Sequence, residues 1–170
     1  VAYTTMKEAT TLAKTNSKQL VMYLNTNGVL ITQNIVSKLK EFSSFLVVII
    51  SLDGPREAHN SVRKFRNGRG SFDRVVRAID LLRKEDIPIA ISATLGLHNQ
   101  EYLHELVDLL VLHRIHGMGL NPIIVTEKNL PNLPIETMID AIEYADDVGF
   151  QVGGLWGRVC SRLKQGAYGA

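Results

Sequence analysis

The stretch VVIISLDGPREAHNSVRKFRNGRGSF, residues 47–72, passes abruptly from bulky apolar residues to polar and basic ones. The apolar run starts at Phe45 and ends at Ser51, and Asp53-Gly54-Pro55 then gives a turn signal. A short run that is apolar at every position is typical of a strand in a parallel sheet, buried on both faces under helices. We therefore predict a buried strand over residues 45–51, followed by a basic loop.

Strand and helix patterns alternate along the rest of the chain. Apolar runs of strand length occupy residues 19–25, 87–96 and 117–125, and a shorter one occupies residues 150–154. Helical periodicity lies between them, over residues 4–14, after Thr32, after Ser71, after Asn99, and from Ile135 to Gly149. Thr32, Ser71 and Asn99 are candidate N-caps. The alternation predicts one α/β domain with a parallel sheet flanked by helices.

The helical patterns also predict which side chains face the core. The strongest pattern follows Ser71, where apolar residues recur with helical spacing. The expected core positions are Met6, Ala9, Leu12, Ala13, Ile35, Val36, Leu39, Phe72, Val75, Val76, Ile79, Leu82, Leu103, Leu106, Val107, Leu110, Val111, Ile135, Met138, Ile139, Ile142 and Ala145.

Composition limits the class of protein. The chain has 170 residues, 45% hydrophobic and 21% charged, which is typical of one globular domain. A formal net charge of +2 gives no reason to expect nucleic acid as a partner. No apolar run is long enough for a membrane span and no signal peptide opens the chain, so we expect a cytoplasmic protein without a membrane partner. The first residue is Val1, which suggests a piece of a longer protein.

The sequence gives no metal site of its own. It contains one cysteine, Cys160, and one thiol can neither form an internal disulfide nor hold a zinc or iron–sulfur site alone. The five histidines lack metal-ligand spacing, and we interpret them as structural or solvent-exposed.

Polar residues follow the predicted strands where ligands bind in parallel α/β sheets, at the carboxyl ends. The residues at these ends are Asn25, Thr26, Asn27, Gly28, Ser51, Asp53, Gly54, Ser92, Thr94, Gly96 and Asn121. Turns favour the same residue types for backbone reasons alone, so the set is more informative than its members. The seven basic residues from Arg56 to Arg77 are typical, for the most part, of a solvated surface.

Two segments together resemble a known family. YLNTNGVLIT (residues 23–32) and ISLDGPREAHNSVRKFRNGRGSFDRVVRAIDLL (residues 50–82) resemble radical S-adenosylmethionine (SAM) enzymes. The resemblance is to the type with a SPASM extension, which includes the anaerobic sulfatase-maturing and peptide-modifying enzymes. It rests on T-N-G, S-L-D-G-P, H-x-x-x-R and the helix start G-x-G-[ST]-F in combination, and it covers about residues 6–125.

The resemblance implies a partial (β/α)6 TIM-like barrel, with an iron–sulfur cluster ([4Fe–4S]) held by three cysteines of a C-x-x-x-C-x-x-C loop. It implies cleavage of SAM to a 5′-deoxyadenosyl radical that modifies a peptide or protein substrate. On the matching positions, Ser51 would hydrogen-bond the polar end of SAM and Arg63 would pair with its carboxylate. Thr26 and Asn27 would lie near the cofactor, and residues 120–124 would line the adenine.

The chain departs from the family pattern at both ends. It lacks the three-cysteine loop, the Gly-Gly-Glu segment that receives the SAM amino group, and the cysteine-rich extension. We therefore interpret residues 1–150 as the C-terminal part of the barrel, strands three to six, and residues 151–170 as the start of the extension. SAM and [4Fe–4S] would belong to the parent protein, with neither expected bound to this chain, which is predicted to be inactive alone.

Two other interpretations remain open. The chain could be a natural cluster-free relative that serves as an α/β scaffold or peptide-binding module. It could also be an unrelated α/β barrel enzyme that binds a phosphorylated substrate at the RNGRG loop, residues 66–70.

Loss of two barrel strands would leave residues 19–25 at an open sheet edge. Exposed apolar edges pair with other chains, so we expect self-association through this strand, or cover by the N-terminal helix or tail.

Overall fold

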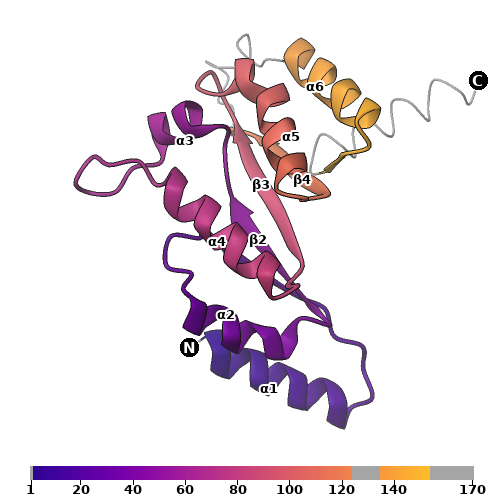
Figure 1. Cartoon of the computed structure of the whole chain (residues 1–170). Coiled ribbons are helices and arrows are strands. Elements are labelled where there is room, and N and C mark those ends of the chain that lie inside the picture. The colour runs from indigo at the N-terminus through magenta and orange to yellow at the C-terminus, as the bar shows by residue number, and fades with distance from the viewer. Residues whose placement is uncertain (1, 124–134, 154–170) are drawn as a thin grey trace, which may run out of the picture.

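The computed structural model describes residues 2–123 and 135–153, and these residues form a five-stranded parallel sheet with flanking helices (Figure 1). The strand order is β1-β2-β3-β4-β5, so strands that are neighbours in the sheet are also consecutive in the chain. The strands are β1 (Met22–Thr26), β2 (Leu46–Ser51), β3 (Ile89–Leu95), β4 (Gly117–Pro122) and β5 (Gln151–Gly153). The helices are α1 (Ala2–Thr15), α2 (Gln33–Leu39), α3 (Arg56–Val62), α4 (Phe72–Lys84), α5 (Leu103–Leu112) and α6 (Ile135–Asp147), with short 3-10 turns η1 (Lys40–Phe42) and η2 (Gln100–Tyr102).

Helices cover one face of the sheet. Ile50, Ile91 and Met118 align across β2, β3 and β4, and all three are buried. Helix α4 packs against β2 and β3 and contributes Val75, Ile79 and Leu82 to the same core. In Figure 1, α4, α5 and α6 lie on the same side of the strands. The strongest helical pattern in the sequence therefore marks the core correctly.

The opposite face of the sheet is open, which corrects the prediction that residues 45–51 are buried on both faces. Along β2, buried Leu46, Val48 and Ile50 alternate with half-buried Val47 and Ile49. Both faces of a barrel strand carry apolar residues, because the interior of a barrel is also a packed core. A continuous apolar run alone does not distinguish a barrel strand from a strand between two helix layers.

The topology identifies the type of sheet. In doubly wound folds the strand order reverses and helices cover both faces. Here the order runs in one direction and the helices lie on one face, as in the wall of a (β/α) barrel. The chain thus forms part of a TIM-like barrel, as the sequence predicts.

Some side chains predicted for the core are exposed instead. Leu12, Ile35, Val111 and Ile139 are 63%, 37%, 44% and 45% exposed, respectively. Each lies at the margin of an apolar stripe that is wider than the contact its helix makes; in α1, Met6 is the buried residue. The segment predicted as a basic loop after β2 contains the helix α3 (Arg56–Val62), and β1 starts at Met22 rather than residue 19.

No described helix is long and apolar enough to cross a membrane. Several predictions fall outside the described residues: the end of the fourth predicted strand at Ile124 and Val125, Cys160, and nearly all of the extension at residues 151–170.

Candidate functional site

Small polar side chains line the open face of the sheet toward the carboxyl ends of the strands. Ser51 pairs in register with Ser92, Ser92 with Gly119, and Thr94 with Asn121, so these residues share one face. The Asn121 side-chain amide donates to the Ser92 hydroxyl, with Nδ2 3.3 Å from Oγ. Within the described part of the chain the Ser51 hydroxyl makes no hydrogen bond. This face therefore presents the Ser51 hydroxyl and the Asn121 side-chain amide, with space above its short side chains.

A carboxylate–guanidinium pair lies where β2 ends. Arg63 Nε donates to Asp53 Oδ2 at 2.5 Å, and Arg63 Nη2 donates to Asp53 Oδ1 at 3.1 Å. The backbone N–H of Thr94 donates to the same Oδ1 at 2.9 Å. The Asp53 side chain is 3% exposed and that of Arg63 30% exposed. This pairing takes two of the five guanidinium N–H groups and leaves the Nη1/Nη2 edge free for a second carboxylate.

Helix α3 brings these two residues together. Its seven residues reverse the chain after the Gly54-Pro55 turn, so that Arg63, its C-cap, meets Asp53. Gly54 has φ +158°, and a Cβ there would lie 2.8 Å from the Cβ of Ala58. The S-L-D-G-P sequence thus lets the first turn of the helix pack closely against the strand end.

Asn99 joins the loops that follow β2 and β3. Its Nδ2 donates to the carbonyl oxygens of Asp53 at 2.5 Å and Thr94 at 2.9 Å, and its Oδ1 accepts from Gly96 N–H at 2.9 Å. Asn99 is fully buried. It occupies the predicted N-cap position, but its side chain makes no cap hydrogen bond because these loops use all of its polar groups.

The imidazole ring of His59 also stabilises the loop after β2 by hydrogen bonds. Its Nδ1 accepts the Asp53 N–H at 3.3 Å, so the ring proton is on Nε2 and is donated to Ser71 Oγ at 2.9 Å. Ser71 Oγ in turn donates to the Arg63 carbonyl at 3.1 Å. Burial lowers the pKa of His59 to about 4, against an ordinary value of 6.5, and the Asp53 carboxylate only partly offsets this. His59 is therefore neutral at physiological pH and acts as a fixed structural link.

Ser71 is likewise diverted from the capping role that the sequence suggests. It is the N-cap of α4 but makes no side-chain cap bond. Asn60 provides this bond instead, since its Oδ1 accepts the Phe72 N–H at 3.0 Å. Thr32 also occupies its predicted N-cap position without a side-chain bond.

The four predicted site residues do not all meet. Arg63 and Asn27 line one pocket of about 230 Å³, together with Val29, Val62, Lys64, Phe65 and Ser71. Ser51 does not line this pocket and lies on the open face of the sheet. Thr26 pairs in register with Ile50, so its side chain belongs to the helix-covered face, and its Oγ1 accepts the Gly28 N–H in the turn. Asn27 Oδ1 similarly accepts the Val29 N–H at 3.3 Å.

Three residues hold Arg63 and its loop: Asp53, His59 and Asn99. The sequence predicts Asp53 as one of the polar residues at the strand ends, His59 as structural or solvent-exposed, and Asn99 as an N-cap, but it predicts none of them as a partner of Arg63 or its loop.

No described residues group as a metal site. The sequence has a single cysteine, so the three thiolates of a family [4Fe–4S] cluster do not fit this chain.

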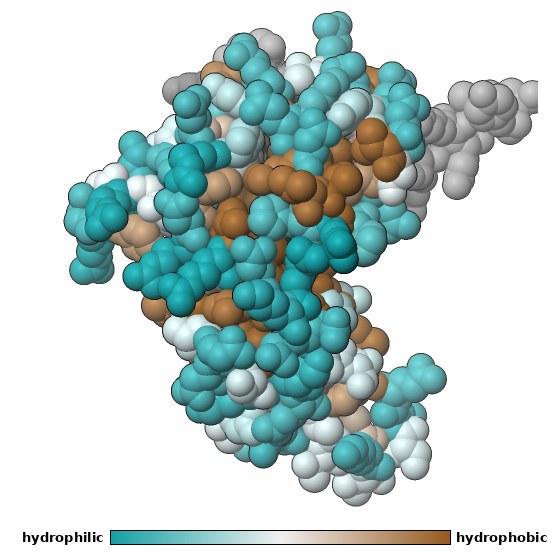
Figure 2. Space-filling view, viewed as in Figure 1, coloured by the Kyte–Doolittle hydropathy of each residue, from teal (hydrophilic) through white to brown (hydrophobic). Residues whose placement is uncertain are grey.

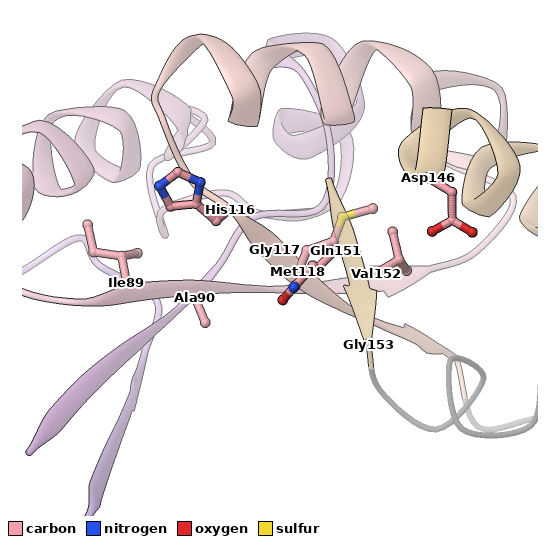
Figure 3. A pocket seen from close by; sticks show the side chains of 9 residues that line it. All are labelled: Ile89, Ala90, His116, Gly117, Met118, Asp146, Gln151, Val152 and Gly153. Carbon is pink, nitrogen blue, oxygen red and sulfur yellow. The ribbon is translucent and has the colours of Figure 1, made fainter. Parts of the chain in front are cut away.

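A second pocket, of about 610 Å³, lies at the opposite end of the sheet, between the amino ends of β3, β4 and β5 (Figure 3). Its polar side chains include His116 and Asp146, which do not point toward each other in Figure 3. Ligands of parallel α/β sheets bind at the carboxyl ends, so this pocket is not our candidate.

Comparison with known proteins agrees with this arrangement. The sequence model described as "Radical SAM superfamily" matches residues 3–110. The AdoMet-dependent heme synthase of Methanosarcina barkeri is 35% identical over 91 residues, which is 53% of this chain and 25% of that protein. The serine-type anaerobic sulfatase-maturating enzyme of Bacteroides thetaiotaomicron is 35% identical over 79 residues, 46% of this chain and 19% of that protein. The chain thus spans about a quarter or less of the length of these relatives.

Among solved structures, native anSMEcpe with bound AdoMet and Cp18Cys peptide has the same fold, with a TM-score of 0.62 at 22% identity. The match covers 69% of this chain and 33% of that one.

Proposed function

Because the chain belongs to the radical SAM superfamily, we propose that it forms the SAM-binding part of an enzyme that modifies a peptide or protein. The observation that carries the proposal is the Arg63 guanidinium, which Asp53 holds where β2 ends and whose Nη1/Nη2 edge makes no hydrogen bond within the described residues. A planar guanidinium held in this way suits a carboxylate, and SAM has one at its amino-acid end.

The neighbouring residues have roles that follow from their positions. The Ser51 hydroxyl hydrogen-bonds the polar end of SAM, and Asn27 closes the Arg63 pocket. Gly119 and Asn121 leave space for the adenosine along β4. Bound SAM supplies the chemistry of the superfamily, hydrogen-atom abstraction by a radical derived from it, while these residues bind and orient it.

In our proposal the [4Fe–4S] cluster is bound by a part of the parent protein outside this chain. Residues 1–150 are strands three to six of the barrel, and a longer protein supplies the cysteine loop and the extension. The chain alone then does not cleave SAM. A peptide or protein is the proposed substrate, supported by the peptide in the anSMEcpe structure.

SAM binding is tested by NMR, since half a site binds weakly. Titration of the ¹⁵N-labelled chain with SAM should shift the amide signals of residues 51–54, 63 and 119–121, with a Kd of about 0.1–1 mM. Arg63→Ala should abolish these shifts, whereas Arg66→Ala, a change at an exposed residue of the same loop, should not. Shifts confined to the pocket at the amino ends of the strands would refute this site.

Catalysis is tested after iron and sulfide reconstitution. The isolated chain should form no 5′-deoxyadenosine, and the product of the complete reading frame should form it when peptide is present. Formation of 5′-deoxyadenosine by the isolated chain would refute our proposal. Absence of a C-x-x-x-C-x-x-C frame upstream would favour the cluster-free scaffold or peptide-binding module.

A further inference from the structure

A third pocket lies beside the carboxyl end of β1 and is distinct from the Arg63 pocket. It has a volume of about 600 Å³ and lies between the loop after β1, the hairpin turn after α3, and α4. We call it the rim pocket; the lining residues that matter here are Val29, Leu30, Phe65, Arg69, Arg74 and Arg77. Nothing in the proposed SAM site uses it.

The rim pocket has uncompensated positive charge. Arg69, Arg74 and Arg77 are exposed, and within the described residues their guanidinium groups have no ion-pair or hydrogen-bond partner. The neighbouring Asp73 does not neutralise them, because Arg56 Nη1 and Nη2 donate to its two carboxylate oxygens at 2.7 and 2.6 Å. Three free guanidinium groups around one hollow attract anionic groups.

The pocket also has an apolar side. Leu30 is 77% exposed and Phe65 36% exposed, and half-buried Val29 also lines the pocket. In Figure 2 the face that includes α4 and the hairpin is largely hydrophilic, with apolar side chains showing among the polar ones. An occupant that satisfies both parts carries carboxylates together with an aliphatic side chain. An acidic peptide has both, whereas a nucleic acid presents phosphates without an aliphatic group.

The rim pocket adjoins the Arg63 pocket. Val29 and Phe65 line both pockets. A chain bound in the rim pocket can therefore continue toward the barrel mouth.

We propose that the rim pocket docks an acidic segment of the peptide or protein substrate, with its carboxylates on Arg69, Arg74 and Arg77 and an aliphatic side chain against Leu30 and Phe65. This inference rests on the proposed function, because it takes the barrel mouth as the place of reaction. Docking of this kind weakens as salt screens the exposed charges.

The test uses fluorescence anisotropy with a labelled twelve-residue peptide that alternates Glu pairs with Leu. We expect saturable binding that weakens with salt, and binding about tenfold weaker for Arg74→Gln/Arg77→Gln. Leu30→Ser should also weaken it. The matched control, Lys14→Gln/Lys84→Gln, removes two exposed charges elsewhere and should bind as the parent does. Circular dichroism confirms folding of each variant.

Three outcomes would overturn the docking proposal: equal binding by the arginine variant and the parent, tighter binding of a twelve-residue single-stranded DNA, or binding by the chain but not by the complete gene product. The last would assign the pocket to an internal segment. Titrating the same variants with SAM distinguishes the docking proposal from the proposed SAM site. If the arginine variant loses peptide binding but keeps the SAM-dependent NMR shifts, the docking proposal is supported. If the chain binds the peptide but shows no SAM-dependent shifts, only the SAM site is refuted.

Discussion

At the end of β2, the buried carboxylate of Asp53 needs its ion-pair partner more than the partly exposed guanidinium of Arg63 does. Asp53 is buried, with its carboxylate satisfied by Arg63 and the Thr94 N–H, whereas Arg63 is partly open to solvent. Removing Arg63 leaves a buried charge without its counter-ion, which costs more than the pair itself contributes. In the proposed SAM site Asp53 is therefore a positioning residue, because it would act on the ligand only through Arg63.

This asymmetry predicts a double-mutant cycle. Arg63→Gln should lower the free energy of unfolding by about 2–4 kcal/mol, because Asp53 remains charged and buried. Asp53→Asn/Arg63→Gln should be more stable than Arg63→Gln alone, since the buried charge is gone. Urea denaturation of the four proteins measures this. Equal stability of the single and double variants would show that Asp53 does not need its partner.

His59 makes stability depend on pH. In the unfolded chain its pKa has the ordinary value of 6.5, and in the folded chain burial lowers it to about 4. The unfolded state thus binds more protons between these values, so stability is full above pH 6.5 and falls as the pH approaches 4. The loss is on the order of 3 kcal/mol. His59→Gln should flatten this part of the urea-derived profile, and His116→Gln, at an exposed position, should not.

At the scale of elements, the hairpin turn and α4 are joined through Asn60. A Cβ on Gly70 would lie 2.0–2.4 Å from the side-chain amide of Asn60, the group that caps the Phe72 N–H. Gly70 is thus small so that Asn60 can reach the helix end.

Gly70→Ala should displace the cap and cost about 1–2 kcal/mol. Asn60→Ala should cost a similar amount. The double variant should be little worse than Asn60→Ala, because the Asn60 amide atoms that the added methyl group would meet most closely are then gone. Thermal unfolding followed by circular dichroism provides the measurement, and additive losses would contradict the shared mechanism.

The edge strand β1 is the other element with a testable consequence. Its ladder runs to β2 only, and Val21 and Tyr23 are 61% and 64% exposed. The predicted cover by the N-terminal helix does not reach them, because α1 packs instead on η1, with the Tyr3 and Phe42 rings 5.7 Å apart. Self-association through this edge therefore remains our prediction.

Sedimentation velocity should show reversible dimers at high concentration. Val21→Lys/Tyr23→Lys should shift the equilibrium to monomer, because two charges at an edge oppose pairing. Lys14→Gln/Lys84→Gln serves as the control. A parent chain that stays monomeric at all concentrations would refute the prediction.

For the molecule as a whole, the sequence predicts the strands and the helix-covered core well, because periodic burial leaves a pattern in the residues, as in α4. It did not predict the open face: Val47 and Ile49 are apolar whether a helix or a barrel interior faces them. The sequence also did not predict the hydrogen-bond network of His59, Ser71 and Asn99. Ser71 and Asn99 have the residue types of caps, and only the meeting of separate loops assigns their side chains to His59 and Asp53.

The two faces should respond oppositely to added bulk. On the open face, a Cβ at Gly119 would have only ordinary contacts, 3.7 Å from Asn121 Nδ2 and 3.8 Å from the Ile91 carbonyl. Gly119→Val should therefore leave the free energy of unfolding unchanged or slightly higher, because β-branched residues suit strands better than glycine. On the covered face, Ala93 is fully buried, and Ala93→Leu should cost about 1–3 kcal/mol by overpacking. If SAM lies along β4, Gly119→Val should abolish the SAM-dependent NMR shifts while the protein stays folded. Retained shifts at residues 51–54 and 63 would move the adenosine away from this face and leave only the Arg63 end of the proposed site.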